Sequence, residues 1–462
     1  MISGVIADRK PTGGRFGAKS PGGGSLAVSA NARPFGFWIC LALVVGNMIG
    51  SGVYLLPASL APFGWAGVFG WIFTIGGAMC LAIVFARLAG AFPEAGGPYA
   101  YAREAFGPFV GFVVAWTYWV SLWIGNVAVA TGVVAPLGTL FPFVAAHSVW
   151  WTLAILWLLT LVNCLGARLA GGIQVAATAL KFLPLAAVIL LAAIVLARQG
   201  TSVLPPLRPE HFAFSGASGI GAAATLTLWS FLGLESATIP AEKVANPRRV
   251  IGRATVAGTA VTGLVYLFAC SAPALLLPVG EASRSGAPLA DFVALHWGPA
   301  AGAILALFAA ITAFGALNGW ILVQGEMPWA MASDGVLPRW LAGLSRRGTP
   351  ARAYVLTSCL ITAVLLLNAA RSATDLFKFL ILLATTASLV AYLVCSLAAI
   401  ALPARRRMAS DYLLLAAAAL GTAYSAWAIW GAGAEANLWG LGLMASGVPI
   451  FLFMRLKQAG RG

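Results

Sequence analysis

The sequence predicts an all-α integral membrane protein with about twelve transmembrane helices. Of its 462 residues, 61% are hydrophobic and only 9% are charged, whereas soluble domains are about 45–50% apolar and about 25% charged. A helical span needs about 20 mainly apolar residues, and windows of this kind recur along the chain. They lie at residues 36–58, 66–89, 108–135, 149–166, 173–197, 218–240, 252–278, 291–325, 352–369, 374–401, 411–431 and 436–455.

The first and sixth windows are interrupted by residues that do not favour a continuous helix. Gly46, Gly50 and Gly52 interrupt the first, and Gly233 and Glu235 interrupt the sixth. Glycine weakens a helix interior by about 1 kcal/mol relative to alanine. Interrupted segments at corresponding positions in two halves are typical of transporters built from inverted repeats. We therefore predict a five-plus-five inverted repeat with broken helices 1 and 6, followed by two extra helices.

The same pattern divides the chain into a tail, a membrane domain and a short end. Residues 1–34 are rich in glycine, serine and basic residues and lack the apolar core of a signal peptide, so we expect a disordered cytoplasmic tail. Residues 457–462 are expected to form a second cytoplasmic tail. The membrane domain is predicted at 35–456, with repeats at about 36–197 and about 218–401 and the extra helices at about 411–455.

The net charge of +15 lies mainly in short loops, which favours orientation in a membrane over nucleic-acid binding. Loops on the side of the N-terminus carry most of the basic residues, including the run Arg405–Arg407. The loops on the other side carry Arg198, Arg208, Arg284, Arg371 and Lys378. Because basic loops stay in the cytoplasm, we predict a multi-pass protein of a bacterial inner membrane with both termini cytoplasmic.

The interruptions also carry recognisable motifs. The segments concerned are Gly46–Gly52, Gly96–Ala102, Tyr118–Trp119, Trp123–Asn126, Trp229–Ala237, Asn246–Arg249, Asn318–Trp320 and Ser333–Gly335. Together they resemble the amino acid, polyamine and organocation transporter superfamily. Within it they are most similar to the bacterial arginine/agmatine antiporters, with lysine/cadaverine and ornithine/putrescine exchangers as near relatives. The resemblance extends from about residue 36 to about residue 455.

The resemblance implies how the common end of an amino acid is held. A broken helix leaves backbone N–H groups unpaired at the start of one half and C=O groups unpaired at the end of the other. By resemblance, Ser51 and Gly52 face the substrate carboxylate. The α-amino group then donates to the carbonyl oxygens of Met48, Trp229 and Leu232. For Ser51, a hydrogen bond between helices is the alternative interpretation.

The resemblance assigns the other end of the substrate to a tryptophan and a polar group. A guanidinium can stack on an aromatic face for about 0.5–2 kcal/mol while it donates in its own plane, and Trp320 matches the family's stacking tryptophan. Asn126, with the carbonyl oxygens of Ser121 and Leu122, matches the polar end of the family's pocket. The family's serine in helix 10 is replaced here by Ala384.

Three aromatic residues are expected to gate the pathway. Tyr118, Trp229 and Tyr392 match gating residues of the antiporters. A bulky ring suits this role because one rotamer change can occlude a small substrate. Packing in the protein core is the alternative interpretation, above all for Tyr392, whose sequence neighbourhood is less distinctive.

Two charged residues fall well inside the predicted spans. Glu235 is the only acid placed there, and an ionisable residue at bilayer depth indicates a functional site. Because burial disfavours the charged form of a carboxyl group, we expect Glu235 to sense acid pH, as the matching antiporter residue is thought to do; a neutral, hydrogen-bonded acid is the alternative. Lys181 instead matches proton-coupled and broad-range transporters of the superfamily, where the ammonium occupies the place of a coupling sodium ion.

Other classes of protein are disfavoured by the sequence. No HExxH, GxSxG or Walker motif indicates an enzyme, and neither rings of charged residues nor a repeated filter loop indicates a channel. The six cysteines lie in apolar stretches without a CxxC pair, and we expect no metal or cofactor. Expected partners are amino acids, polyamines and membrane lipid, with no nucleic acid, and the family's homodimer is an open alternative to a monomer.

Two modes of transport follow from these residues. Trp320, Asn126 and Glu235 favour exchange of arginine, or another cationic amino acid, for its decarboxylated polyamine such as agmatine. Coupled to cytoplasmic decarboxylation, this exchange exports one proton equivalent per cycle and would serve acid resistance. Lys181 and Ala384 favour proton-coupled uptake or broad exchange of amino acids instead.

Overall fold

The computed structural model describes residues 33–50, 52–216, 218–285, 287–367, 373–406 and 411–459, without the side chains of residues 55, 139, 373–382, 404–406, 435 and 436. Most of the predicted N-terminal tail, Ser51 and Arg371 therefore lie outside the described residues. The described chain is helical, with one isolated bridge between Phe35 and Val244. The predicted all-α membrane fold is confirmed.

Nine helices in the described ranges are long and apolar enough to cross a membrane. Each of them corresponds to one predicted window. Proline occupies the first turn of α5, α10 and α13, where its missing N–H group has no helical partner to lose. The nine are α3 (Trp65–Ala91), α5 (Pro108–Leu140), α7 (Ser148–Leu165), α8 (Ala167–Gln199), α10 (Pro247–Leu276), α13 (Pro299–Ser333), α15 (Ala373–Arg406), α16 (Tyr412–Gly431) and α17 (Ala434–Ala459).

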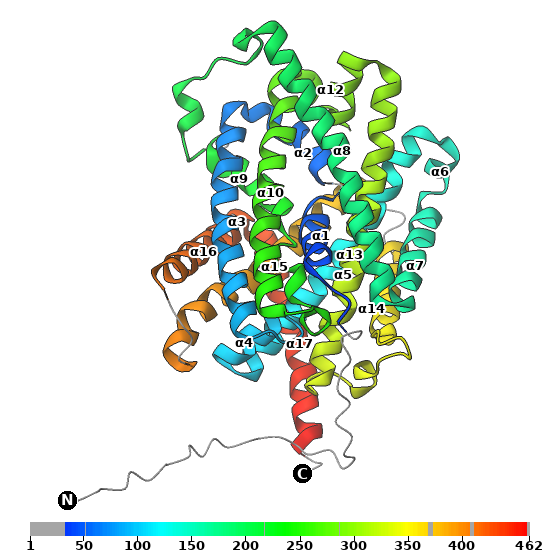
Figure 1. Ribbon diagram of the computed structural model, residues 1–462, viewed down its shortest axis with the longest axis vertical. Coiled ribbons are helices and arrows are strands. Elements are labelled where there is room, and N and C mark those ends of the chain that lie inside the picture. Colours follow the sequence, from blue (N-terminus) through cyan, green and yellow to red (C-terminus); the bar gives the residue numbers. More distant parts are fainter. Residues whose placement is uncertain are drawn as a thin grey trace, which may run out of the picture. The chain divides into compact units, whose positions relative to one another are not determined.

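The remaining three predicted spans are short or broken. The first consists of α1 (Phe37–Met48) and α2 (Gly52–Leu60), which lie one above the other inside the bundle (Figure 1). The ninth is α14 (Ala351–Leu367). The sixth begins as α9 (Ile220–Leu228) and continues, beyond the predicted interruption, as short 3₁₀ turns. These turns are η5 (Trp229–Phe231), η6 (Ser236–Thr238) and η7 (Ala241–Lys243).

Short helices and turns connect the spans. None of those described here is long enough to cross a membrane, because a helix rises only about 1.5 Å per residue. They are η2 (Ala61–Phe63), α4 (Pro98–Phe106), α6 (Pro142–Ala146), η3 (Thr201–Val203), η4 (Pro209–Phe212), α11 (Val279–Ala282), α12 (Pro288–Trp297) and η8 (Arg339–Ala342).

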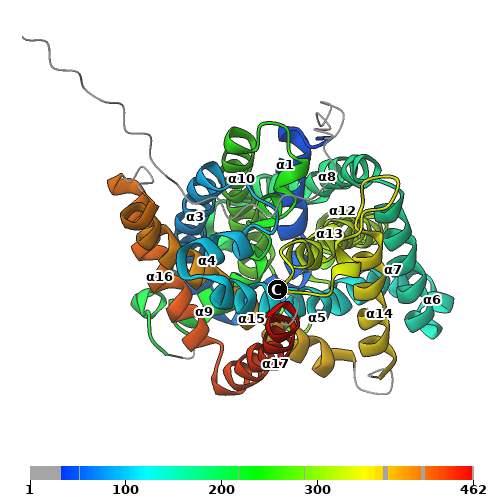
Figure 2. The ribbon, with the colours of Figure 1, turned by 90° about the horizontal axis from the view of Figure 1, so that it is seen from below.

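The spans pack in pairs that are five spans apart in the sequence. The second span, α3, packs on the seventh, α10, and the third, α5, packs on the eighth, α13. Helix α1 packs against α8, α10 and α13, so the first break lies within the bundle. Figure 2 shows α16 at one edge of the bundle and α7 and α14 at the opposite edge. This pairing fits the predicted repeat followed by two extra helices.

Candidate functional site

A buried lysine binds the backbone at the first break. Helix α1 ends at Met48, and the ammonium of Lys181 from α8 donates to the carbonyl oxygens of Gly46, at 2.5 Å, and Ile49, at 2.7 Å. The Lys181 side chain is completely buried. The last carbonyl groups of a helix have no partner within the helix, and a cation there also complements the helix dipole. Lys181 therefore caps the first half of the broken helix.

The second break depends on a glycine. Gly233 has a φ of +107°, a conformation that side-chain-bearing residues rarely adopt. A β-carbon on Gly233 would also lie 3.0 Å from Cβ of Asn47 and 3.0 Å from Cζ2 of Trp320. Only glycine lets the two breaks approach this closely, and the chain turns here between η5 and η6.

A chain of buried amides fixes the two breaks to the surrounding helices. Asn47, at the end of α1, donates to Oγ of Ser236 in η6 at 2.9 Å, which joins the breaks directly. Gln174 of α8 donates to Oδ1 of Asn47 at 3.3 Å and accepts from Asn318 of α13 at 3.1 Å. Trp320 of α13 donates to the carbonyl oxygen of Asn47 at 3.2 Å. The positions of both breaks are thus coupled to α8 and α13.

A cavity of about 50 Å³ lies where the two breaks meet α5, α13 and α15. All the predicted substrate-binding residues that the structure describes line it: Met48, Gly52, Ser121, Leu122, Asn126, Trp229, Leu232 and Trp320. The remaining one, Ser51, lies outside the described residues. Further lining residues are Asn47, Gly50, Val53, Gly125, Val129, Ser230, Ala316, Ala384 and Ser388.

The backbone carbonyls predicted to hold an α-amino group differ in their present partners. The oxygen of Met48 already accepts from the Tyr266 hydroxyl at 2.6 Å and from the Gly50 amide at 2.9 Å. The oxygen of Trp229 accepts from the Leu232 amide at 3.2 Å. Among the described residues, the oxygen of Leu232 accepts no hydrogen bond, so it has the most free capacity for a cationic group.

Two predicted gating residues meet the predicted pH-sensing residue. The hydroxyl groups of Tyr118, from α5, and Tyr392, from α15, both donate to the carboxyl group of Glu235. The backbone amide of Gly233 donates to the same carboxyl group at 3.2 Å. All three side chains are buried. The third predicted gating residue, Trp229, lies apart from this cluster in the wall of the cavity.

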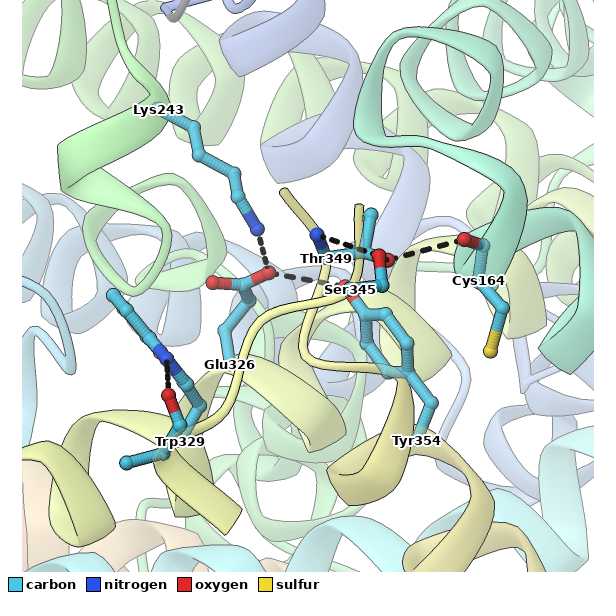
Figure 3. A network of polar contacts seen from close by, with 8 residues as sticks. Cys164, Lys243, Glu326, Trp329, Ser345, Thr349 and Tyr354 are labelled. Atoms are coloured by element: carbon cyan, nitrogen blue, oxygen red, sulfur yellow. Dashed lines mark hydrogen bonds and ion pairs between the residues drawn. The ribbon is translucent and has the colours of Figure 1, made fainter. Parts of the chain in front are cut away.

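The prediction that Glu235 is the only acid inside the spans is wrong. Glu326 of α13 is 1% exposed, and it accepts from the ammonium of Lys243 in η7 and from the hydroxyl of Tyr354 in α14, the latter at 3.0 Å. Figure 3 shows both donors pointing at the same carboxylate. The eighth predicted window ends at residue 325, whereas α13 continues to Ser333 and so includes Glu326.

The segments that flank the broken helices are also joined near this ion pair. The amide of Phe35, just before α1, donates to the carbonyl oxygen of Lys243 at 3.0 Å. The amide of Ala245 in turn donates to the oxygen of Phe35 at 2.8 Å. This two-bond link between the start of the first span and the end of the sixth had no signal in the sequence, because it uses only backbone groups.

Sequence comparison gives the family of the chain. The amino acid permease family matches residues 35–449, which include both breaks and the cavity. A cadaverine/lysine antiporter of Escherichia coli is 32% identical over 372 residues, or 79% of this chain and 82% of that protein. A protein of Bacillus subtilis provisionally named an arginine/ornithine antiporter is 32% identical over 396 residues, or 79% and 83%. A putrescine transporter of Haemophilus influenzae is 28% identical over 435 residues, or 93% and 99%. The chain therefore belongs to the amino acid permease family, within the amino acid, polyamine and organocation superfamily of multi-pass membrane transporters.

Proposed function

We propose that the chain exchanges a cationic amino acid for a polyamine across the bacterial inner membrane. The observation that carries this proposal is the cavity between the two broken helices, which is lined by the residues that the family motifs select for binding. Arginine for agmatine is the pair that the sequence motifs favour. The name of the Escherichia coli relative supports lysine for cadaverine as the second pair to test.

In this proposal the two ends of the substrate meet different chemistry. The carboxylate faces the backbone N–H groups of Ser51 and Gly52 at the start of α2, where the helix dipole favours an anion. The α-amino group faces the carbonyl oxygens of Met48, Trp229 and Leu232. The side-chain cation stacks on Trp320 and donates to Asn126 and to the carbonyl oxygens of Ser121 and Leu122.

We propose that the aromatic residues next to the cavity gate the substrate pathway. Trp229 closes one wall, and Tyr118 and Tyr392 hold the buried Glu235. A change in the protonation of Glu235 would alter two tyrosine hydrogen bonds at once. We propose that this cluster gives transport its pH response. Both termini lie in the cytoplasm in this proposal, and the family's homodimer can be tested by the mass of the purified complex.

Exchange can be measured directly with the purified chain in lipid vesicles. Vesicles loaded with agmatine should take up labelled arginine, and vesicles loaded with cadaverine should take up labelled lysine if that pair is used. Empty vesicles should take up neither. Equal uptake into loaded and empty vesicles would contradict exchange.

A second candidate function is proton-coupled uptake of amino acids, and the contacts of Lys181 favour it. Its ammonium bonds to two carbonyl oxygens of the first break, so loss of its proton would weaken the hold on the end of α1, because charge-assisted hydrogen bonds are the stronger ones. An imposed pH gradient should then drive net uptake into substrate-free vesicles, and Lys181→Ala should remove this response. Absence of gradient-driven uptake in the wild type would leave exchange as the function.

Trp320→Leu is expected to weaken binding of a guanidinium substrate by about 0.5–2 kcal/mol, since stacking is the interaction that is lost. The dissociation constant for arginine would be measured on the purified variant by calorimetry. Trp329→Leu is a matched control, because Trp329 lies on the same helix, donates to the Ala342 carbonyl at 3.1 Å and does not line the cavity. An unchanged affinity in Trp320→Leu would remove this residue from the site.

Glu235→Gln is expected to flatten the pH dependence of transport, because the amide keeps the shape of the side chain but does not titrate near neutral pH. Initial rates of exchange would be measured between pH 5 and 8 in vesicles of equal internal and external pH. Glu210→Gln serves as the control, since Glu210 is well exposed in a connecting turn. A profile like that of the wild type would place pH sensing elsewhere.

A further inference from the structure

One side of the cavity presents a hydroxyl group that the family motifs do not include. Ser388 of α15 is 6% exposed and lines the cavity one helical turn after Ala384. Its Oγ lies 3.1 Å from Oγ of Ser121 on α5. Ser121 in turn donates to the carbonyl oxygen of Tyr118 at 2.6 Å.

The direction of this hydrogen-bond chain follows from its last acceptor. A backbone carbonyl can only accept, and a serine hydroxyl has one proton, so the proton of Ser121 is used on Tyr118. Ser388 is then the donor to Ser121. Its own oxygen keeps its acceptor sites, and it receives no hydrogen bond from any described residue. Ser388 therefore turns an acceptor, and no donor, toward the cavity.

A second chain orients the amide of Asn126 in the same sense. Thr160 donates to the carbonyl oxygen of Leu156 at 2.8 Å, so its partner Ser358, 2.7 Å away, must donate to Thr160. The amide nitrogen of Gln324 donates to Ser358 at 3.3 Å, which leaves its oxygen to accept from Asn126 at 2.5 Å. Asn126 donates one of its two amide N–H groups to Gln324, and its Oδ1 accepts no hydrogen bond from any described residue.

We propose that Ser388 and Asn126 select the head group of the substrate, and that they accept only a group that donates hydrogen bonds, an ammonium or a guanidinium. The inference rests on the proposed function, because it concerns the far end of the same cavity. No charged side chain lines this cavity in the described part of the chain, so these two oriented oxygens add to the stacking on Trp320 and to the backbone carbonyls of Ser121 and Leu122. A carboxylate head group would meet lone pairs, and an aliphatic head group would leave both oxygens without a partner.

Gln324 has a positioning role in this scheme. It does not line the cavity, and it acts by holding the amide of Asn126 in one of its two orientations. Ala384 has no hydroxyl group, and Ser388, one turn later on the same helix, supplies one instead. The selectivity of the site is therefore retained although one family position has changed.

The test is equilibrium binding to the purified full chain, with lysine, arginine, agmatine, cadaverine and norleucine as competing ligands. Norleucine shares the common end of lysine and the length of its chain but has a methyl head group. Ser388→Ala should lower the affinity for the four cations about tenfold, which corresponds to about 1.4 kcal/mol, and leave that for norleucine unchanged. Gln324→Met should lower the ratio of lysine to norleucine affinity in the same direction.

Ser396→Ala is the matched control. Ser396 lies on α15 two turns beyond Ser388, is completely buried, and has a hydroxyl group without a partner among the described residues. Its substitution should change no affinity. A wild-type chain that binds none of the cations would contradict the proposed function itself. Cation binding that is unchanged in Ser388→Ala, an equal loss in Ser396→Ala, or norleucine binding as strong as lysine binding would overturn this inference alone.

Discussion

Lys243→Met is expected to lower the free energy of unfolding by about 3–5 kcal/mol, because it leaves the carboxylate of Glu326 buried without its cation. Glu326 is 1% exposed, and the side chain of Lys243 is 13% exposed. The hydroxyl of Tyr354, at 3.0 Å, remains as a single neutral donor. The free energy of unfolding of the variant and of the wild type would be measured in detergent by chemical or thermal unfolding.

Two further variants separate the ion pair from the loss of a side chain. Combining Lys243→Met with Glu326→Leu should recover most of the stability, since an apolar pair of similar volume often replaces a buried ion pair without cost. Arg249→Met, at an exposed position shortly after Lys243, should change stability little. A loss in Lys243→Met no larger than that in Arg249→Met would show that the pair is not energetically important.

Gly319→Ala is expected to disrupt both the fold and transport. Its β-carbon would lie 1.9 Å from Oδ1 of Asn47 and 2.7 Å from Nε2 of Gln174, so these amides must move apart. Overpacking of this kind costs about 1–3 kcal/mol, and each buried amide left without a partner costs about 1–3 kcal/mol more. Because Asn47 joins the two breaks and lines the cavity, substrate affinity should fall together with stability.

The control for this variant is Gly172→Ala. A β-carbon on Gly172, in α8, would meet no atom within 4 Å, and alanine favours a helix over glycine by about 1 kcal/mol. Gly172→Ala should therefore transport normally and unfold at the same or a higher temperature. If Gly319→Ala were as stable and as active as Gly172→Ala, the amide chain through Asn47 would not be required.

The spans could be predicted because they depend on local composition. A run of about 20 apolar residues is helical in a membrane whatever its neighbours are, since every backbone group must be satisfied within the segment. The breaks could also be predicted from local sequence, because glycine weakens a helix interior and Gly50 and Gly233 mark the two positions. The form of the second half of the sixth span could not, because its 3₁₀ turns are held by contacts with other helices, such as the bond from Asn47 to Ser236.

The partners of buried polar residues were the main features that the sequence did not reveal. Lys243 and Glu326 are 83 positions apart, and nothing in either local sequence indicates the other. Gln174 is a polar residue in an apolar window. This indicates that it has a buried hydrogen-bond partner, but it does not identify that partner. Ser388 had a usable signal, because a residue four positions after Ala384 lies on the same face of a helix. Substrate binding by these cavity residues remains a prediction.

The short link at Phe35 has a consequence for how the molecule can move. Phe35 is completely buried, and it makes two backbone hydrogen bonds, with Lys243 at the end of η7 and with Ala245 just after it. Breaking this link would leave the N–H and C=O groups of the buried Phe35 unpaired, at about 1–3 kcal/mol each. Shifting α1 alone is thus more costly than shifting it together with the end of the sixth span. The start of the first span and the end of the sixth are therefore linked, and we expect them to move together when the molecule opens and closes.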